Sequence, residues 1–179
     1  MTFESLQRAI KLPVFTTSDV GLAFPLESSQ SVNISLYRLA KSQKIENIKR
    51  GVYKFIGAKV DEFSLARILY TPSYVSMGSV LNSCGVIPDV PLSVTSVTTT
   101  TSKKISTHVG VFFYSKLPRK LYFGFENGVA LPEKALLDYL YIRRIRNLEN
   151  YRIDISHLDK TKIKEFAKYY PAWLQKVLK

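Results

Sequence analysis

The chain has 179 residues, of which 46% are hydrophobic and 22% charged, and its formal net charge is +12. These proportions are typical of a globular protein and exclude a disordered one, and the length allows one domain or two small ones. The excess of cations extends through the whole chain. It favours a polyanionic partner, most simply nucleic acid, although solubility alone is an alternative explanation.

Cysteine and histidine are too scarce for a disulfide or for metal-ligand spacing, because Cys84 is accompanied only by His108 and His157. We therefore expect no metal and no cofactor. No apolar run approaches the roughly 18 residues of a membrane span, and the N-terminal residues lack the pattern of a signal peptide. We expect a cytoplasmic protein that has no membrane partner.

Two short helices are predicted at the start of the chain. Residues 1–12 place apolar side chains on one helical face, which Thr2 can cap and Pro13 ends. Thr16 and Asp19 have the spacing of a capping box, which predicts a second helix that runs toward the next proline.

A third helix is predicted over residues 28–42, and its two sides differ in character. One side is apolar and contains Ile34, Leu36, Leu39 and Ala40. The other side holds short polar groups and cations, with no acid among them: Ser31, Asn33, Ser35, Arg38, Lys41 and Ser42. Short donors reach base edges in a major groove and cations bind phosphates, so this helix is predicted to read DNA, with Tyr37 against the sugar-phosphate backbone.

A hairpin is predicted directly after this helix, with strands over 46–49 and 52–55. Gly51 can adopt the positive φ of a tight turn, which places Lys49 and Arg50 at the tip. We expect these two cations, with Lys41, to hold phosphates. The order of elements predicts a winged helix-turn-helix over residues 1–57.

A linker over 58–73, which can form a short helix, and a C-terminal domain over 74–179 are predicted to follow. The expected elements are a helix over 74–83, strands over 92–101, 108–117 and 120–126, an amphipathic helix from 132 to 146, an edge strand over 152–156, and a last helix after a capping box of Ser156 and Asp159. We therefore predict an α+β protein whose second domain is a small mixed α/β domain with a β-sheet flanked by helices.

A catalytic set is only faintly indicated in the C-terminal half. Glu133, Lys134, Asp138 and Asp89 are the residue types of a nuclease site, in which acids hold Mg²⁺ and a lysine stabilises phosphate charge. The favoured alternative places Glu133 in a helix first turn and makes Lys134 and Asp138 an i, i+4 surface pair. We therefore predict that the protein is not an enzyme.

A second basic patch is one of two interpretations of the remaining cations. Its residues would be Lys103, Lys104, Lys116, Arg119, Lys120, Arg143, Arg144 and Arg146. Such a patch would contact DNA flanks or an RNA. The other interpretation is that the arginines are a solvated helix end that complements the helix dipole.

The ordered combination of four segments resembles the AbiEi-type antitoxins. LYRLAKSQKI at 36–45 is followed by the hairpin IENIKRGVYKF at 45–55, and later by YVSMGSVLNSCGVIPDVP at 74–91 and VALPEKALLDYLYIRR at 129–144. The resemblance extends over roughly residues 1–150.

This resemblance implies a type IV toxin–antitoxin or abortive-infection system that acts in phage defence. The chain would neutralise a nucleotidyltransferase-type toxin without a stable complex, and would repress its own operon by binding inverted repeats in promoter DNA. A monomer in solution that binds DNA cooperatively is compatible with this role. The alternatives are a stand-alone DNA-binding transcriptional regulator, or an enzyme that modifies nucleic acid through its C-terminal domain.

Overall fold

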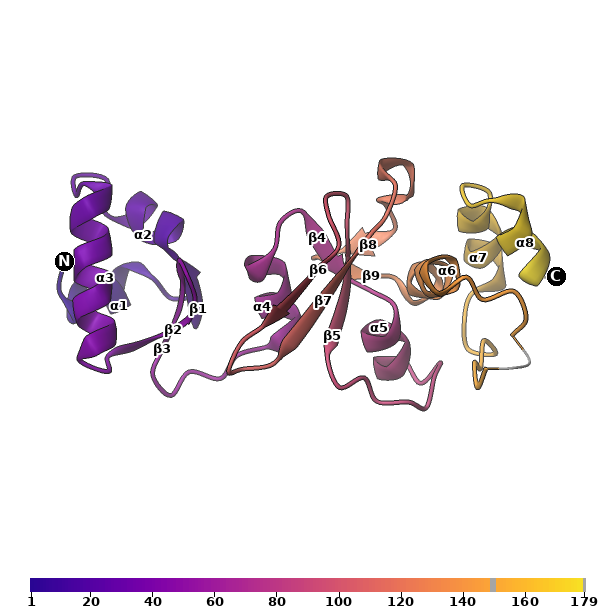
Figure 1. Ribbon diagram of the computed structural model, residues 1–179, viewed down its shortest axis with the longest axis horizontal. Coiled ribbons are helices and arrows are strands. Elements are labelled where there is room, and N and C mark those ends of the chain that lie inside the picture. The colour runs from indigo at the N-terminus through magenta and orange to yellow at the C-terminus, as the bar shows by residue number, and fades with distance from the viewer. Residues whose placement is uncertain (149–150, 179) are drawn as a thin grey trace. The chain divides into compact units, whose positions relative to one another are not determined.

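The computed structural model describes residues 1–148 and 151–178, and it confirms the α+β class (Figure 1). The chain divides into two compact units. Unit 1 comprises Met1–Leu69 together with Thr107–Val109, and unit 2 comprises the other described residues from Tyr70 onward.

Unit 1 contains four helices and three strands among the described residues. They are α1 (Phe3–Ala9), β1 (Val14–Thr16), α2 (Thr17–Ala23), α3 (Ser29–Lys41), β2 (Ile45–Lys49), β3 (Val52–Phe55) and α4 (Glu62–Leu69). The predicted helix starts are confirmed. The Thr2 side chain accepts from the backbone N–H of Ser5 at 3.2 Å, and that of Thr16 accepts from Asp19 at 3.1 Å.

The strands of unit 1 form one antiparallel sheet in the order β1-β3-β2. The predicted hairpin is confirmed, and Gly51 in its turn has φ +79°. Strand β1 was not predicted. Its three residues are too few to show an alternating pattern, and it exists because β3 supplies its hydrogen-bonding partner.

The core of unit 1 lies between its first three helices and this sheet. Its buried members are Leu6, Ile10, Phe15, Val20, Val32, Leu36 and Ile45. Helix α3 buries Val32 and Leu36, and it half-buries Leu39 and Ala40. The predicted burial of Ile34 is wrong, because its side chain is 44% exposed. Ile34 is two positions from each buried residue, which turns it about 200° away from them.

Unit 2 is built on one six-stranded sheet in the order β6-β7-β5-β4-β9-β8. Its elements are β4 (Ser73–Val75), α5 (Gly78–Ser83), β5 (Val94–Thr98), β6 (Lys103–Ser106), β7 (Val111–Lys116), the 3₁₀ turn η1 (Arg119–Leu121), β8 (Phe125–Glu126), β9 (Val129–Ala130), α6 (Pro132–Arg143), α7 (Lys160–Ala167) and α8 (Ala172–Val177). Strands β5 and β7 are parallel, as are β4 and β9, and the other pairs are antiparallel.

Several predicted elements of unit 2 differ from the structure. Residues 73–75 form a strand before α5, and η1 occupies the first part of the strand predicted over 120–126. No strand forms over 152–156, which are described residues. Asp159 alone caps α7, because its carboxylate accepts from Thr161 and Lys162, and Pro171 separates α7 from α8. Short strands such as β4 depend on tertiary partners that local pattern does not reveal.

Helix α6 is enclosed on several sides, since it packs against α5, α7, α8 and β9 (Figure 1). Pro132 occupies its first turn, as predicted. The prediction of a surface pair on this helix is wrong, because Lys134 and Asp138 are both 0% exposed. Within the described residues, no helix combines the length and apolar character needed to cross a membrane.

Candidate nucleic-acid interface

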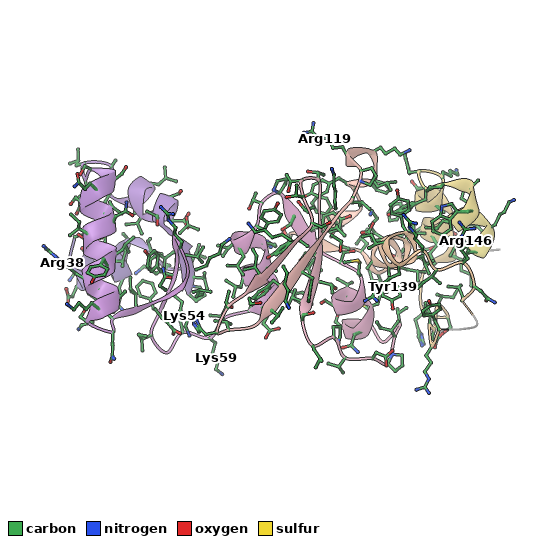
Figure 2. The ribbon with its side chains drawn as sticks, viewed as in Figure 1. Arg38, Lys54, Lys59, Arg119, Tyr139 and Arg146 are labelled. Atoms are coloured by element: carbon green, nitrogen blue, oxygen red, sulfur yellow. The ribbon has the colours of Figure 1, made fainter. Side chains whose placement is uncertain are left out.

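The outward face of α3 differs from the predicted polar face. It carries Ile34, Tyr37, Arg38 and Lys41, all of which are exposed; the side chain of Tyr37 is 67% exposed. Figure 2 shows Arg38 extending away from the other elements of unit 1. No acidic residue lies within α3, so the face combines cations with exposed apolar groups.

The short polar residues of α3 do not share one face. Ser31 and Asn33 are exposed and Ser35 is half-buried, and residues two apart on a helix point about 200° from one another. The hydroxyl of Ser31 also donates to the carboxylate of Glu27 at 3.1 Å. Asn33 therefore points away from Ser31 and Ser35, which are four positions apart and lie on one side of the helix, and Arg38 follows Ser31 by seven positions on that same side.

The hairpin presents one of its two predicted cations to solvent. Arg50 is exposed in the turn. Lys49 is half-buried instead, and its ammonium donates to the backbone carbonyl of Leu69 at 3.1 Å. Along the hairpin, Lys54 pairs with Glu46 at 2.9 Å. Arg50 is therefore the better candidate for contact with a phosphate.

The residues of the predicted second basic patch are exposed but fall into three groups in unit 2. Lys103 and Lys104 lie on the edge strand β6, over the rings of Tyr70 and Phe113 at 5.5 and 5.4 Å. Arg119 and Lys120 belong to η1. Arg143, Arg144 and Arg146 lie at and beyond the end of α6, and Lys116 at the end of β7 lines one pocket with the last two of them. Figure 2 shows Arg146 well separated from Arg119. One continuous patch does not form.

The charged residues of α6 belong to a buried network. The Lys134 ammonium donates to Asp138, to the Tyr74 hydroxyl at 2.8 Å and to the Tyr170 hydroxyl at 2.8 Å. Both hydroxyls donate to the Asp138 carboxylate, at 2.9 and 2.7 Å, as does that of Ser76 at 2.8 Å. Every polar group of this network thus has a partner.

Burial perturbs the titration of this network. Desolvation raises the pKa of Tyr74 and of Tyr170 far above the usual value, and the neighbouring Asp138 carboxylate raises both further. Desolvation also lowers the pKa of Lys134, and the attraction of Asp138 opposes that shift. The network therefore holds its hydroxyls neutral and keeps its two charged groups out of solvent.

The residues that suggested a nuclease do not converge. Asp89 is exposed on a loop, whereas Glu133 is buried and accepts from the backbone N–H of Asp159 at 3.1 Å. Among the residues the structure describes, no group of three or more histidine, cysteine or acidic side chains could hold a metal ion.

The outward position of Ile34 could have been found from sequence, because Val32, Leu36 and Leu39 make a better helical stripe than the one that includes Ile34. The partners of Lys134 could not, because Tyr74 and Tyr170 are distant in the chain.

Comparisons with known proteins show the fold alone. No protein-family description and no curated protein matches the chain. Among solved structures, the chain is similar to the crystal structure of the RV2827C protein from Mycobacterium tuberculosis. The TM-score is 0.60 at 11% identity, and the match covers 98% of this chain and 73% of that chain.

Proposed function

We propose that unit 1 is a winged helix-turn-helix that binds double-stranded DNA. Helix α3 would lie in the major groove, and the β2–β3 hairpin would be the wing. The observation that carries this proposal is the acid-free outward face of α3, on a domain whose sheet runs in the order β1-β3-β2 and ends in a hairpin with Arg50 at its turn.

The outward face of α3 suits DNA because it offers two kinds of contact. Arg38 can donate to base edges or phosphates, and Lys41 and Arg50 can neutralise phosphates. Ile34 and Tyr37 would contact the apolar surface of the groove, such as a thymine methyl group. Ser31, Asn33 and Ser35 flank these residues on the helix, and their predicted groove contacts stay part of the proposal.

We propose further that the protein is an antitoxin of AbiEi type that represses its own operon. This step is supported by the resemblance of the four segments above. It implies promoter DNA with inverted repeats, and a nucleotidyltransferase-type toxin that is neutralised without a stable complex. A non-enzymatic role is supported by the burial of Lys134 and Asp138, which a substrate would not reach.

DNA binding is tested by titrating the full chain against the DNA upstream of its own gene and against a scrambled duplex. We expect Arg38→Ala to reduce the ratio of the two affinities, because a base contact is lost. Arg50→Ala should weaken both duplexes alike, because a phosphate contact carries no sequence information. Two variants that bind as the parent does would refute the assignment of α3 and the wing.

The antitoxin role is tested by co-expression with the product of the adjacent gene. Growth should stop when that product is expressed alone and recover when this chain is present. An adjacent gene whose product is harmless would favour the alternative, a stand-alone transcriptional regulator that binds the same DNA.

A further inference from the structure

Unit 2 contains a basic pocket with a volume of about 410 Å³. Three cations line it, Lys116 at the end of β7 and Arg144 and Arg146 beyond α6, and the remaining wall includes Tyr141, Pro171 and Trp173. No carboxylate is among the lining residues, so the pocket combines positive charge with aromatic surface.

The two arginines are held in place by different means. The guanidinium of Arg146 lies over the indole ring of Trp173, 5.7 Å from its centroid, and stacking of this kind leaves the N–H groups at its edge available. Arg144 occupies the left-handed C-cap of α6, with φ 56°, and its backbone N–H is bonded to the carbonyls of Leu140 and Tyr141. The guanidinium of Arg146 and the backbone of Arg144 are therefore each held by a defined contact.

The aromatic wall comes from α6 and α8. The rings of Tyr141 and Trp173 are nearly parallel, at 14°, with their centroids 6.3 Å apart. Lys116, Arg144 and Arg146 form no ion pair with any other residue that the structure describes. Three cations that line one pocket favour an anionic ligand.

We propose that this pocket binds a nucleotide, with its phosphate on the cations and its base against the ring atoms of Trp173 and Tyr141 that line the pocket. The volume lies within the roughly 300–1,000 Å³ of small-molecule sites, and Arg and aromatic side chains are the usual platforms for unstacked bases. The ligand can be a free nucleotide or one unit of a single strand. The proposal does not rest on DNA binding by unit 1.

The single tryptophan of the chain makes the test direct. The full chain is titrated with uridine monophosphate, uridine triphosphate, a short oligouridylate and inorganic phosphate, and Trp173 emission is followed at an excitation wavelength where uridine absorbs little. We expect each uridine ligand to change the emission with saturation. If the oligouridylate binds more tightly than the triphosphate, the natural ligand is one unit of a single strand. If the triphosphate binds more tightly, the natural ligand is a free nucleotide.

Two double variants separate the pocket from the general charge of the protein. Lys116→Gln with Arg146→Gln should weaken nucleotide binding roughly tenfold or more, because charge-assisted hydrogen bonds are lost. Arg119→Gln with Lys120→Gln removes the same amount of charge from η1, outside the pocket lining. This control should bind the nucleotide with an affinity within about twofold of the parent's.

Three results would overturn the proposal. The first is Trp173 emission that stays constant at millimolar nucleotide. The second is equal weakening by both double variants, which would attribute binding to the overall field. The third is inorganic phosphate that binds as tightly as uridine monophosphate, which would leave the aromatic wall without a role.

Discussion

Removal of one charge from the buried network of unit 2 should destabilise this unit strongly. Asp138→Asn leaves the Lys134 ammonium, 0% exposed, without its counter-ion, and Lys134→Met leaves the Asp138 carboxylate with hydroxyl donors only. Breaking a buried pair in this way costs about 3–5 kcal/mol, a large part of the roughly 5–15 kcal/mol by which a typical protein is stable.

The double variant, Lys134→Met with Asp138→Asn, should lose less free energy of unfolding than the sum of the two single losses, because it leaves no unpaired charge. A coupling energy of about 2 kcal/mol or more is expected. Urea unfolding is followed by the emission of Trp173, which lies in unit 2 on α8. Single variants that each lower the free energy of unfolding by less than about 1 kcal/mol would refute the view that the pair is enclosed. Single losses that add up to the loss of the double variant would refute the view that the pair is energetically coupled.

Three further predictions concern pH, the core and the turn of the hairpin. Burial raises the pKa of Tyr74, Tyr114 and Tyr170, so their contribution to stability is complete below about pH 10 and is lost as the pH rises above it, because only the unfolded chain ionises. The free energy of unfolding should then fall by about 4 kcal/mol per pH unit, about 1.4 for each tyrosine, and a flat alkaline profile in urea titrations would contradict this. Leu36→Ala should cost about 2–5 kcal/mol in chemical unfolding followed by circular dichroism, whereas Ile34→Ala, on the exposed face of the same helix, should cost less than about 1. Gly51→Ala should lower Tm, because a side chain at φ +79° costs about 1–2 kcal/mol of folding free energy. Gly21→Ala should not lower Tm, because an added Cβ at Gly21 meets open space. Equal Tm values for the two variants would show that the turn tolerates the side chain.

Local signals in the sequence predicted unit 1 well. Thr2 and Thr16 cap helices as expected, and Gly51 forms the turn of the hairpin. These features are encoded within a few neighbouring residues. The face of α3 was predicted less well because Ile34, an apolar residue, was assigned to the core when it lies two positions from each of the buried residues of the stripe.

The buried network was not predicted because its pattern is ambiguous in sequence. An opposite-charge pair at i, i+4 usually marks the surface of a helix. The partners that enclose Lys134 and Asp138 come from β4 and from the segment between α7 and α8, and only the tertiary structure brings them together. The pocket beside Trp173 has the same origin, since β7, α6 and α8 each contribute to it.

The salt dependence of DNA binding tests the assignment of α3 most directly. Affinity for duplex DNA is measured over a series of salt concentrations for the parent, for Arg38→Gln with Lys41→Gln, and for the control Arg119→Gln with Lys120→Gln. The α3 variant should flatten the slope of log K against log salt by about 1, because the phosphate contact of Lys41 is lost while Arg38 contacts a base edge, and the control should retain the parental slope. An unchanged slope in the α3 variant, or an equal loss in the control, would contradict the placement of α3 on DNA.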